Sequence, residues 1–284
     1  MPRIDLAKAA KGEKVFKVQG AEATVNVNHI KNVRFRDDTL VIAYENNLKG
    51  PLSPDCSLSI YNAYGMQIGF ATDHWSMDTV APGEVRTSEI TASHSSLFDS
   101  SLFGDYHRAA WDTMLKYTAV NLPSDWNTPA FVILTGDSSG RAPVPTTQTS
   151  GPNRVVLPKV DLVRFRPDCT FPVNGGTANV SGAHVKAVKF GSEDSQPVVN
   201  VVLENTTSEP YRPDCRFVIY NSYGMEIYGF VDQWIVEDIK PQERRQEKFG
   251  FRTFSIEEGL GYSAIRLPDD WEIPAFVAVE GDSP

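Results

Sequence analysis

Ile60-Tyr61-Asn62-Ala63-Tyr64-Gly65-Met66 recurs 159 positions later as Ile219-Tyr220-Asn221-Ser222-Tyr223-Gly224-Met225. Extending the comparison to residues 54–66 and 213–225 gives nine identities in thirteen positions. Two unrelated sequences of ordinary composition would share about one. The chain therefore contains one sequence unit twice, and this repeat decides which fold we expect.

The similarity extends in both directions from this stretch. Residues 16–35 align with residues 171–190, and ten of sixteen positions are identical between residues 122–137 and residues 267–282. A chain of 284 residues also has the length of two ordinary domains. We therefore predict two domains. Their expected bounds are residues 1–140 and 156–284, joined by a Ser-, Gly-, Pro- and Thr-rich linker at residues 141–155.

Short apolar runs and period-two alternation predict β-strands in both copies. The predicted strands lie at residues 23–28, 40–44, 57–61, 160–165, 184–190, 199–203 and 216–220, and the last strand of each copy follows Pro129 or Pro274. Gly65 and Gly224 each lie between two such runs, where glycine supplies the positive φ of a tight hairpin. The alternative for these glycines is a close approach of the backbone to a ligand. The expected fold class is all-β.

A family resemblance starts from the order of these motifs. In each copy a strand carrying Tyr-Asn-x-x-Gly is followed by a further strand and a turn, Val80-Ala81-Pro82-Gly83-Glu84 in the first copy. This pattern resembles the FxLYD-type and related immunoglobulin-like β-sandwich modules of bacteria, which have Tyr-Asp-x-x-Gly before a Leu-x-Pro-Gly-Glu turn. The resemblance covers about 45 residues of each copy. It implies two tandem duplicated Ig-like β-sandwich domains with an adhesive or assembly role and no shared catalytic residues.

One large asymmetry separates the two copies. Pro82 and Tyr117 are 35 positions apart, whereas Pro241 and Tyr262 are 21 apart, so the first copy has 14 extra residues, within residues 91–107. After this insertion, the apolar residues of 110–115 have helical spacing and predict a short helix on the sandwich edge. In the second copy, residues 255–258 have the form of a capping box, but nearby glycines limit the helix to about one turn.

Composition narrows the function classes. A net charge of −9 and a pI near 5.1 argue against nucleic-acid or anionic-membrane binding, because no basic run is longer than Arg244-Arg245. Charges interrupt every apolar run near Met1, so we expect no signal peptide, no membrane insertion and a cytoplasmic location. Cys56, Cys169 and Cys215 fit a reducing compartment as small packed residues, with a disulfide or a thiolate metal site as the alternative.

Two stretches have residues that could carry chemistry: the insertion, which contains histidines, and an acidic stretch near the end of the chain. The insertion holds His94 and His107 near Asp99 and Asp105, but the chain has neither a Gly-x-Ser-x-Gly elbow nor a His-Glu-x-x-His frame. Residues 269–272 are acidic, but they do not form the Asp-x-Asp-x-Asp-Gly frame of a calcium loop. We therefore predict no enzyme activity and no catalytic, cofactor or metal residue.

Four of the five tryptophans recur in register. Recurrence is typical of residues that pack a common fold, and the alternative is an exposed aromatic platform for a glycan or a partner chain. We expect a non-enzymatic structural or adaptor protein that forms homo-oligomers or a larger cellular or viral assembly through sheet edges and the insertion. A glycan- or small-ligand-binding module is the alternative. The candidate contact residues are Trp75, Trp126, Trp234, Trp271, His94, Phe98, Phe103 and Trp111.

Overall fold

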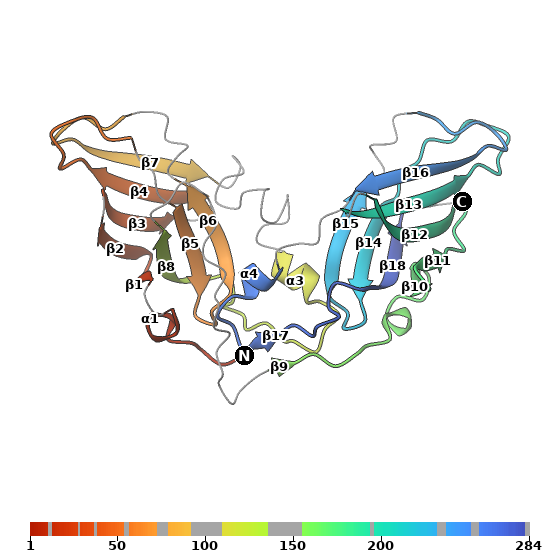
Figure 1. Ribbon diagram of the computed structural model, residues 1–284, viewed down its shortest axis with the longest axis horizontal. Helices are drawn as coiled ribbons and strands as arrows, with labels where there is room; N and C mark the ends of the chain where they lie inside the picture. Colours follow the sequence, from red (N-terminus) through yellow and green to blue (C-terminus); the bar gives the residue numbers. More distant parts are fainter. Residues whose placement is uncertain are drawn as a thin grey trace. The chain divides into compact units, whose positions relative to one another are not determined.

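The computed structural model describes most of the chain, and it is an all-β protein as predicted (Figure 1). The described residues are 1–10, 13–27, 29–36, 39–53, 57–72, 79–91, 110–135, 155–193, 196–231, 237–250 and 256–281. Strands make up about half of these residues, and every predicted strand except one is present. The insertion beyond Thr91 and most of the linker lie outside the described residues.

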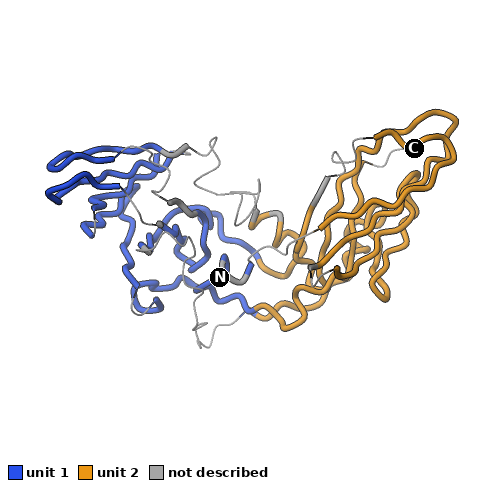
Figure 2. Tube along the Cα trace, turned by 45° about the horizontal axis from the view of Figure 1, so that its top comes forward, with its two compact units in different colours: residues 1–110, 121–155, 255–266 blue, residues 111–120, 156–254, 267–284 orange. Residues whose placement is uncertain are grey.

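The chain forms two compact units, and neither unit is contiguous in sequence (Figure 2). Unit 1 contains residues 1–110, 121–155 and 255–266, and unit 2 contains residues 111–120, 156–254 and 267–284. Relative to the contiguous division expected from the repeat, two short segments have changed places. Residues 111–120 of the first copy lie in unit 2, and residues 255–266 of the second copy lie in unit 1. We call them the exchanged segments.

Unit 1 contains two four-stranded antiparallel sheets with orders β1-β8-β5-β6 and β2-β3-β4-β7. The strands are β1 (Lys14–Lys17), β2 (Glu22–Val27), β3 (Ile30–Arg36), β4 (Thr39–Glu45), β5 (Ser57–Asn62), β6 (Gln67–Thr72), β7 (Val85–Thr91) and β8 (Pro129–Thr135). Side chains from both sheets form one core, in which Leu40, Ile42 and Tyr44 of β4 alternate with less buried residues. Each fully buried side chain of this kind contributes about 2 kcal/mol.

Unit 2 repeats the same strand order as one continuous sheet, β15-β14-β18-β10-β11-β12-β13-β16. The strands are β10 (Thr170–Asn174), β11 (Thr177–Asn179), β12 (Val185–Glu193), β13 (Gln196–Glu204), β14 (Arg216–Asn221), β15 (Glu226–Val231), β16 (Arg244–Gly250) and β18 (Pro274–Glu280). Two further short strands, β9 (Val155–Val156) and β17 (Ile265–Arg266), lie outside the sheet of unit 2. The strands of both units therefore follow the sequence repeat.

The helices are short. They are α1 (Leu6–Ala9), α3 (Ala110–Met114), α4 (Ile256–Leu260) and the 3-10 helix η3 (Leu162–Arg164). The helix predicted from residues 110–115 is confirmed, and the turn predicted after Ser255 forms α4. None of the described helices is long and apolar enough to cross a membrane.

The strand predicted at residues 160–165 is wrong, because η3 lies there. Val160 donates its backbone N–H to Ser222, and the N–H groups of Phe165 and Arg166 both turn back to the Leu162 carbonyl. Leu162 is fully buried while Phe165 is 63% exposed, so a strand with alternating burial has no support in the packing. Leu6 in α1 is buried against the matching face of unit 1. A turn of helix in the lead segment therefore recurs in both units.

A backbone difference between the two copies gives a first prediction. Gly83 has φ +74°, and Gln242 at the matching turn has φ +62°, a conformation that costs a residue with a side chain about 1 kcal/mol. We expect Gln242→Gly to raise the free energy of unfolding by about 1 kcal/mol. The conformational entropy that glycine adds to the unfolded chain reduces this gain. Urea unfolding measures this difference. The reverse change, Gly83→Gln, is the matched control and should lower the free energy of unfolding. If both changes shifted the free energy of unfolding equally and in the same direction, the positive φ of this turn would not explain the difference between the copies.

Candidate functional site

The candidate site is the hairpin tip that carries the repeated motif, residues 62–66 in unit 1 and 221–225 in unit 2. Asn62 is fully buried at the first of these tips. Its Oδ1 accepts the backbone N–H groups of Tyr64 (2.9 Å) and Met66 (3.0 Å), and its Nδ2 donates to the Trp126 carbonyl at 2.6 Å. One side chain thus closes the turn and ties it to the loop before β8.

The second tip has the same hydrogen bonds. Asn221 accepts from Tyr223 and Met225, both at 3.0 Å, and donates to the Trp271 carbonyl at 2.8 Å. An aspartate would accept the two N–H groups equally well, but its second oxygen would face a carbonyl oxygen. The tips therefore favour an amide at this position.

Gly65 and Gly224 hold the turns at φ +76° and +77°, as the hairpin prediction requires. They are also sites of close backbone approach. A Cβ on Gly65 would lie 2.7 Å from the Tyr262 carbonyl carbon, and one on Gly224 would lie 2.5 Å from the Tyr117 oxygen. The approaching chain is an exchanged segment in each case, and Tyr262 donates its backbone N–H to the Gly65 carbonyl at 3.1 Å. Each tip is thus a dock for an exchanged segment.

A tyrosine from each exchanged segment packs beside its tip. In unit 1 the Tyr262 ring meets the Tyr61 ring edge-on, with centroids 5.6 Å apart, and its hydroxyl donates to Glu13 at 2.6 Å. In unit 2 the Tyr117 ring meets the Tyr220 ring at 5.7 Å in the same orientation. Tyr117 and Tyr262 are equivalent in the sequence repeat, so each unit receives the same group from the opposite copy.

A polar cluster borders each tip. Tyr64 donates its hydroxyl to Asp125 at 2.6 Å, and Arg3 pairs with the same carboxylate at 2.7 Å. The hydrogen bond from Tyr64 lowers the pKa of Asp125. Unit 2 repeats the arrangement with Tyr223, Asp270 and Lys159, and the hydrogen bond from Tyr223 lowers the pKa of Asp270. Asp270 therefore has a structural partner, and the described residues include no cluster of three potential metal ligands.

Unit 2 has further charged residues near its dock, of which Glu226 is buried. Arg166 forms a close ion pair with Glu280, and Arg216 lies 3.9 Å from the same carboxylate. Glu226 at the start of β15 is 1% exposed. The repeat places Ser57, Gln67 and Thr135 at the positions of Arg216, Glu226 and Glu280, so unit 1 carries uncharged side chains there.

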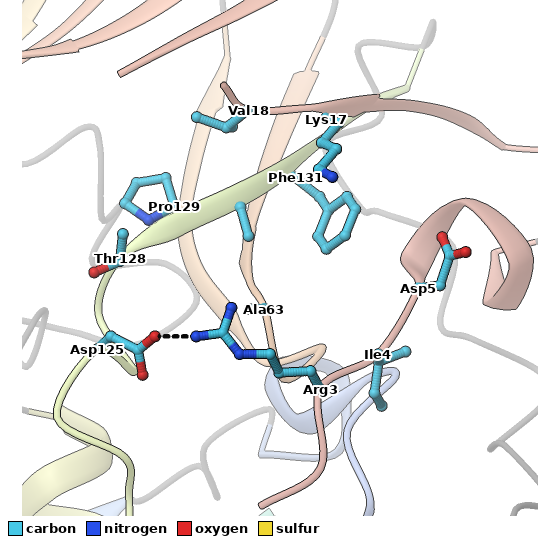
Figure 3. Close-up of a pocket in the computed structure, with 11 residues that line it drawn as sticks. Arg3, Ile4, Asp5, Lys17, Val18, Ala63, Asp125, Thr128, Pro129 and Phe131 are labelled. Atoms are coloured by element: carbon cyan, nitrogen blue, oxygen red, sulfur yellow. Dashed lines mark hydrogen bonds and ion pairs between the residues drawn. The ribbon is translucent and has the colours of Figure 1, made fainter. Parts of the chain in front are cut away.

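A pocket of about 490 Å³ opens beside the first tip (Figure 3). Ala63, Pro129 and Phe131 contribute apolar surface, and Arg3 and Asp125, joined by an ion pair, lie at its charged side. Lys17 and Asp5 add one charge of each sign. The lining has both apolar surface and paired charges, which suits a small amphipathic group better than a strongly charged one.

The predicted contact residues divide into buried and undescribed ones. Trp126, Trp271 and Trp111 are 7%, 5% and 3% exposed, so they pack inside the units rather than form an exposed platform. The remaining candidates, Trp75, Trp234, His94, Phe98 and Phe103, lie outside the described residues.

The cysteines, and two residue pairs that the sequence prediction did not name as sites, have the following places in the structure. Cys169 is a free thiol, the Cys215 Sγ lies 3.8 Å from the Tyr211 hydroxyl, and Cys56 lies outside the described residues. Tyr117 and Tyr262 recur in the repeat, and this recurrence is the sequence signal for a contact that both units share. The mismatch of Gln67 and Glu226 was the signal for the buried acid.

In comparisons with known proteins, no protein-family model matches this chain and no curated protein is significantly similar to it.

Proposed function

We propose that this chain is a non-enzymatic structural or adaptor protein that forms protein assemblies in the cytoplasm. The exchange of segments is the observation that carries the proposal. Each unit is completed by residues from the other sequence copy, so both copies are needed to build either unit. Such an exchange is a common way for repeated or identical domains to associate. The finer fold class, two tandem Ig-like sandwiches, is part of this proposal and is supported by the matching strand orders.

Sheet edges supply the contact surface in this proposal. Within the described residues, β7 pairs only with β4, and β16 pairs only with β13. Both edge strands are seven residues long, and where their side chains are described every second one is exposed. The outward backbone groups of an edge strand can accept a strand from another chain. Charged residues on both edges, including Glu89 and Lys248, would limit pairing to a partner with matching charges.

Light scattering across a concentration series tests self-assembly. We expect a mass above the 31.5 kDa of one chain that rises with concentration and falls when residues 93–107 are deleted. Thr87→Pro and Ser88→Pro test the β7 edge. The backbone N–H groups of adjacent residues in a strand point to opposite sides. One of the two prolines therefore removes an N–H that faces outward, and the other removes an N–H that bonds to β4. Circular dichroism identifies the variant that keeps its fold. A strict monomer at every concentration would refute self-assembly.

Small-ligand binding is the second candidate, and the pocket of unit 1 is the observation that favours it. Trp126 follows Asp125 of the pocket lining, so a ligand that orders this loop should change tryptophan fluorescence. A panel of mono- and disaccharides is the first set to titrate. Arg3→Ala should abolish a true response, and Arg164→Ala, an exposed change in unit 2, is the control. A response that survives Arg3→Ala would place binding elsewhere.

A further inference from the structure

Glu226, at the start of β15, is a buried carboxyl group. It is 1% exposed, and neither of its carboxyl oxygens forms a hydrogen bond with any residue that the structure describes. Unit 1 has Gln67 at the equivalent position, 4% exposed, and its amide donates to the Gly69 carbonyl at 3.4 Å. The same buried site thus holds a neutral amide in one copy and an ionisable acid in the other.

The ladder places Glu226 on the face that an exchanged segment covers. Glu226 is the cross-strand partner of Tyr220, and such partners project from the same side of a sheet. The Tyr220 ring packs against Tyr117 of segment 111–120. Val218, Tyr220 and Leu162 form a buried cluster on this face, with Tyr117 packed against it. An ionised Glu226 would therefore place a charge beside the surface on which the segment docks.

The charged neighbours do not neutralise this acid. The titratable or charged groups around it are Arg216 and Tyr220 on β14, Glu280 on β18, Arg166 after η3 with Cys169 nearby, and Tyr117 with Lys116 on the exchanged segment. Arg166 and Arg216 both pair with Glu280, which itself repels a second negative charge. Burial accordingly raises the pKa of Glu226 from 4.5 to about 7.

We propose that Glu226 is a pH-sensitive switch that lets segment 111–120 dock in unit 2 while the carboxyl is protonated and weakens the docking when it ionises. The switch follows from the location of the acid and does not depend on the proposed assembly function. Segment 255–266 in unit 1 docks beside Gln67, so its docking should not respond to pH in this way. The two units would then have the same architecture, but only unit 2 would respond to pH.

The direction of the pH effect follows from which state holds the proton. Once the segment leaves and water reaches the site, the carboxyl titrates closer to its ordinary value of 4.5. Between that value and about 7, the docked state keeps a proton that the undocked state has lost. Docking therefore weakens as the pH rises through this window and stays constant above it.

Hydrogen exchange read by mass spectrometry tests the switch on the full chain. After correction for the intrinsic pH dependence of exchange, we expect opening of segment 111–120 to increase about tenfold or more across the window, because each unit of pKa difference is a factor of ten. Peptides from 256–266 should show no such increase. Glu226→Gln should remove the increase, and this variant should fold because unit 1 already has glutamine at the site.

A transfer experiment supplies the matched control. Gln67→Glu should move the pH dependence to peptides 256–266 and leave segment 111–120 as in the wild type. If Gln67→Glu does not fold, the comparison of wild type with Glu226→Gln still decides the question. The proposal is overturned if segment 111–120 opens with the same pH dependence in both, or if its opening does not change with pH in the wild type.

Discussion

Replacing Gly224 by alanine is expected to release segment 111–120 from unit 2 and to lower the free energy of unfolding by about 3 kcal/mol. Two costs add. A φ of +77° costs an alanine about 1 kcal/mol. The alanine Cβ would also lie 2.5 Å from the backbone carbonyl oxygen of Tyr117 and 2.8 Å from the Val160 Cγ2. Backbone atoms cannot rotate away as a flexible side chain can, so the overlap adds about 2 kcal/mol unless the segment leaves.

Gly83→Ala separates the two costs, because Gly83 has φ +74° and nothing lies within 4 Å of the added Cβ. We expect this control to cost about 1 kcal/mol and to leave both exchanged segments docked. Gly65→Ala should instead release segment 255–266, whose Tyr262 backbone lies against Gly65. Urea unfolding gives the free energies, and hydrogen exchange of peptides 111–120 and 256–266 reports docking. Equal losses in Gly224→Ala and Gly83→Ala would show that the contact at the tip contributes nothing.

The repeat was sufficient to predict most strands and both hairpin turns, because these depend on residues close in sequence. Alternating apolar residues set the burial of β4, and Gly65 and Gly224 have the positive φ that the turn demands. Residues 160–165 failed as a strand for a different reason. Val160 and Leu162 are apolar, but their backbone bonds go to the β14–β15 tip and to a helical turn, which are contacts outside any local pattern.

The exchange of segments could not be predicted from the residues. Tyr117 and Tyr262 are chemically identical, and so are Tyr61 and Tyr220, so either tyrosine suits either dock. The path of the chain decides which tyrosine reaches which tip. An alignment of the two copies gives no information about that path, because the two sites have the same residues. The tryptophans show the same limit, because recurrence marked Trp126 and Trp271 as shared residues without telling whether they are buried or exposed.

Differences between the copies carry different information from their identities. Positions that agree, such as Asn62 and Asn221, mark contacts that both units need to fold. Positions that disagree within an otherwise matching site mark what one unit does alone. Gln67 and Glu226 have the same shape and the same burial, so the fold accepts either. The choice of an acid in unit 2 therefore has its consequence in ionisation rather than in packing.

Asn62→Asp is the second change with a large expected effect, about 3 kcal/mol lost at neutral pH. The substitution preserves shape and both accepted hydrogen bonds, but it replaces a donor that lies 2.6 Å from the Trp126 carbonyl with an oxygen. Two oxygens at that distance repel, and the new charge would be fully buried. The loss should shrink at low pH, where a protonated carboxyl can again donate to the carbonyl.

The measurement is urea unfolding of Asn62→Asp and Asn221→Asp at neutral and acidic pH. Asn221 makes the same donation to Trp271 at 2.8 Å, so its replacement should cost a similar amount in unit 2. Asn127→Asp adds the same charge at an exposed position next to Trp126 and should cost less than about 0.5 kcal/mol. If Asn62→Asp were as mild as this control, the tip would tolerate a carboxylate, and the donation to Trp126 could not be what selects asparagine.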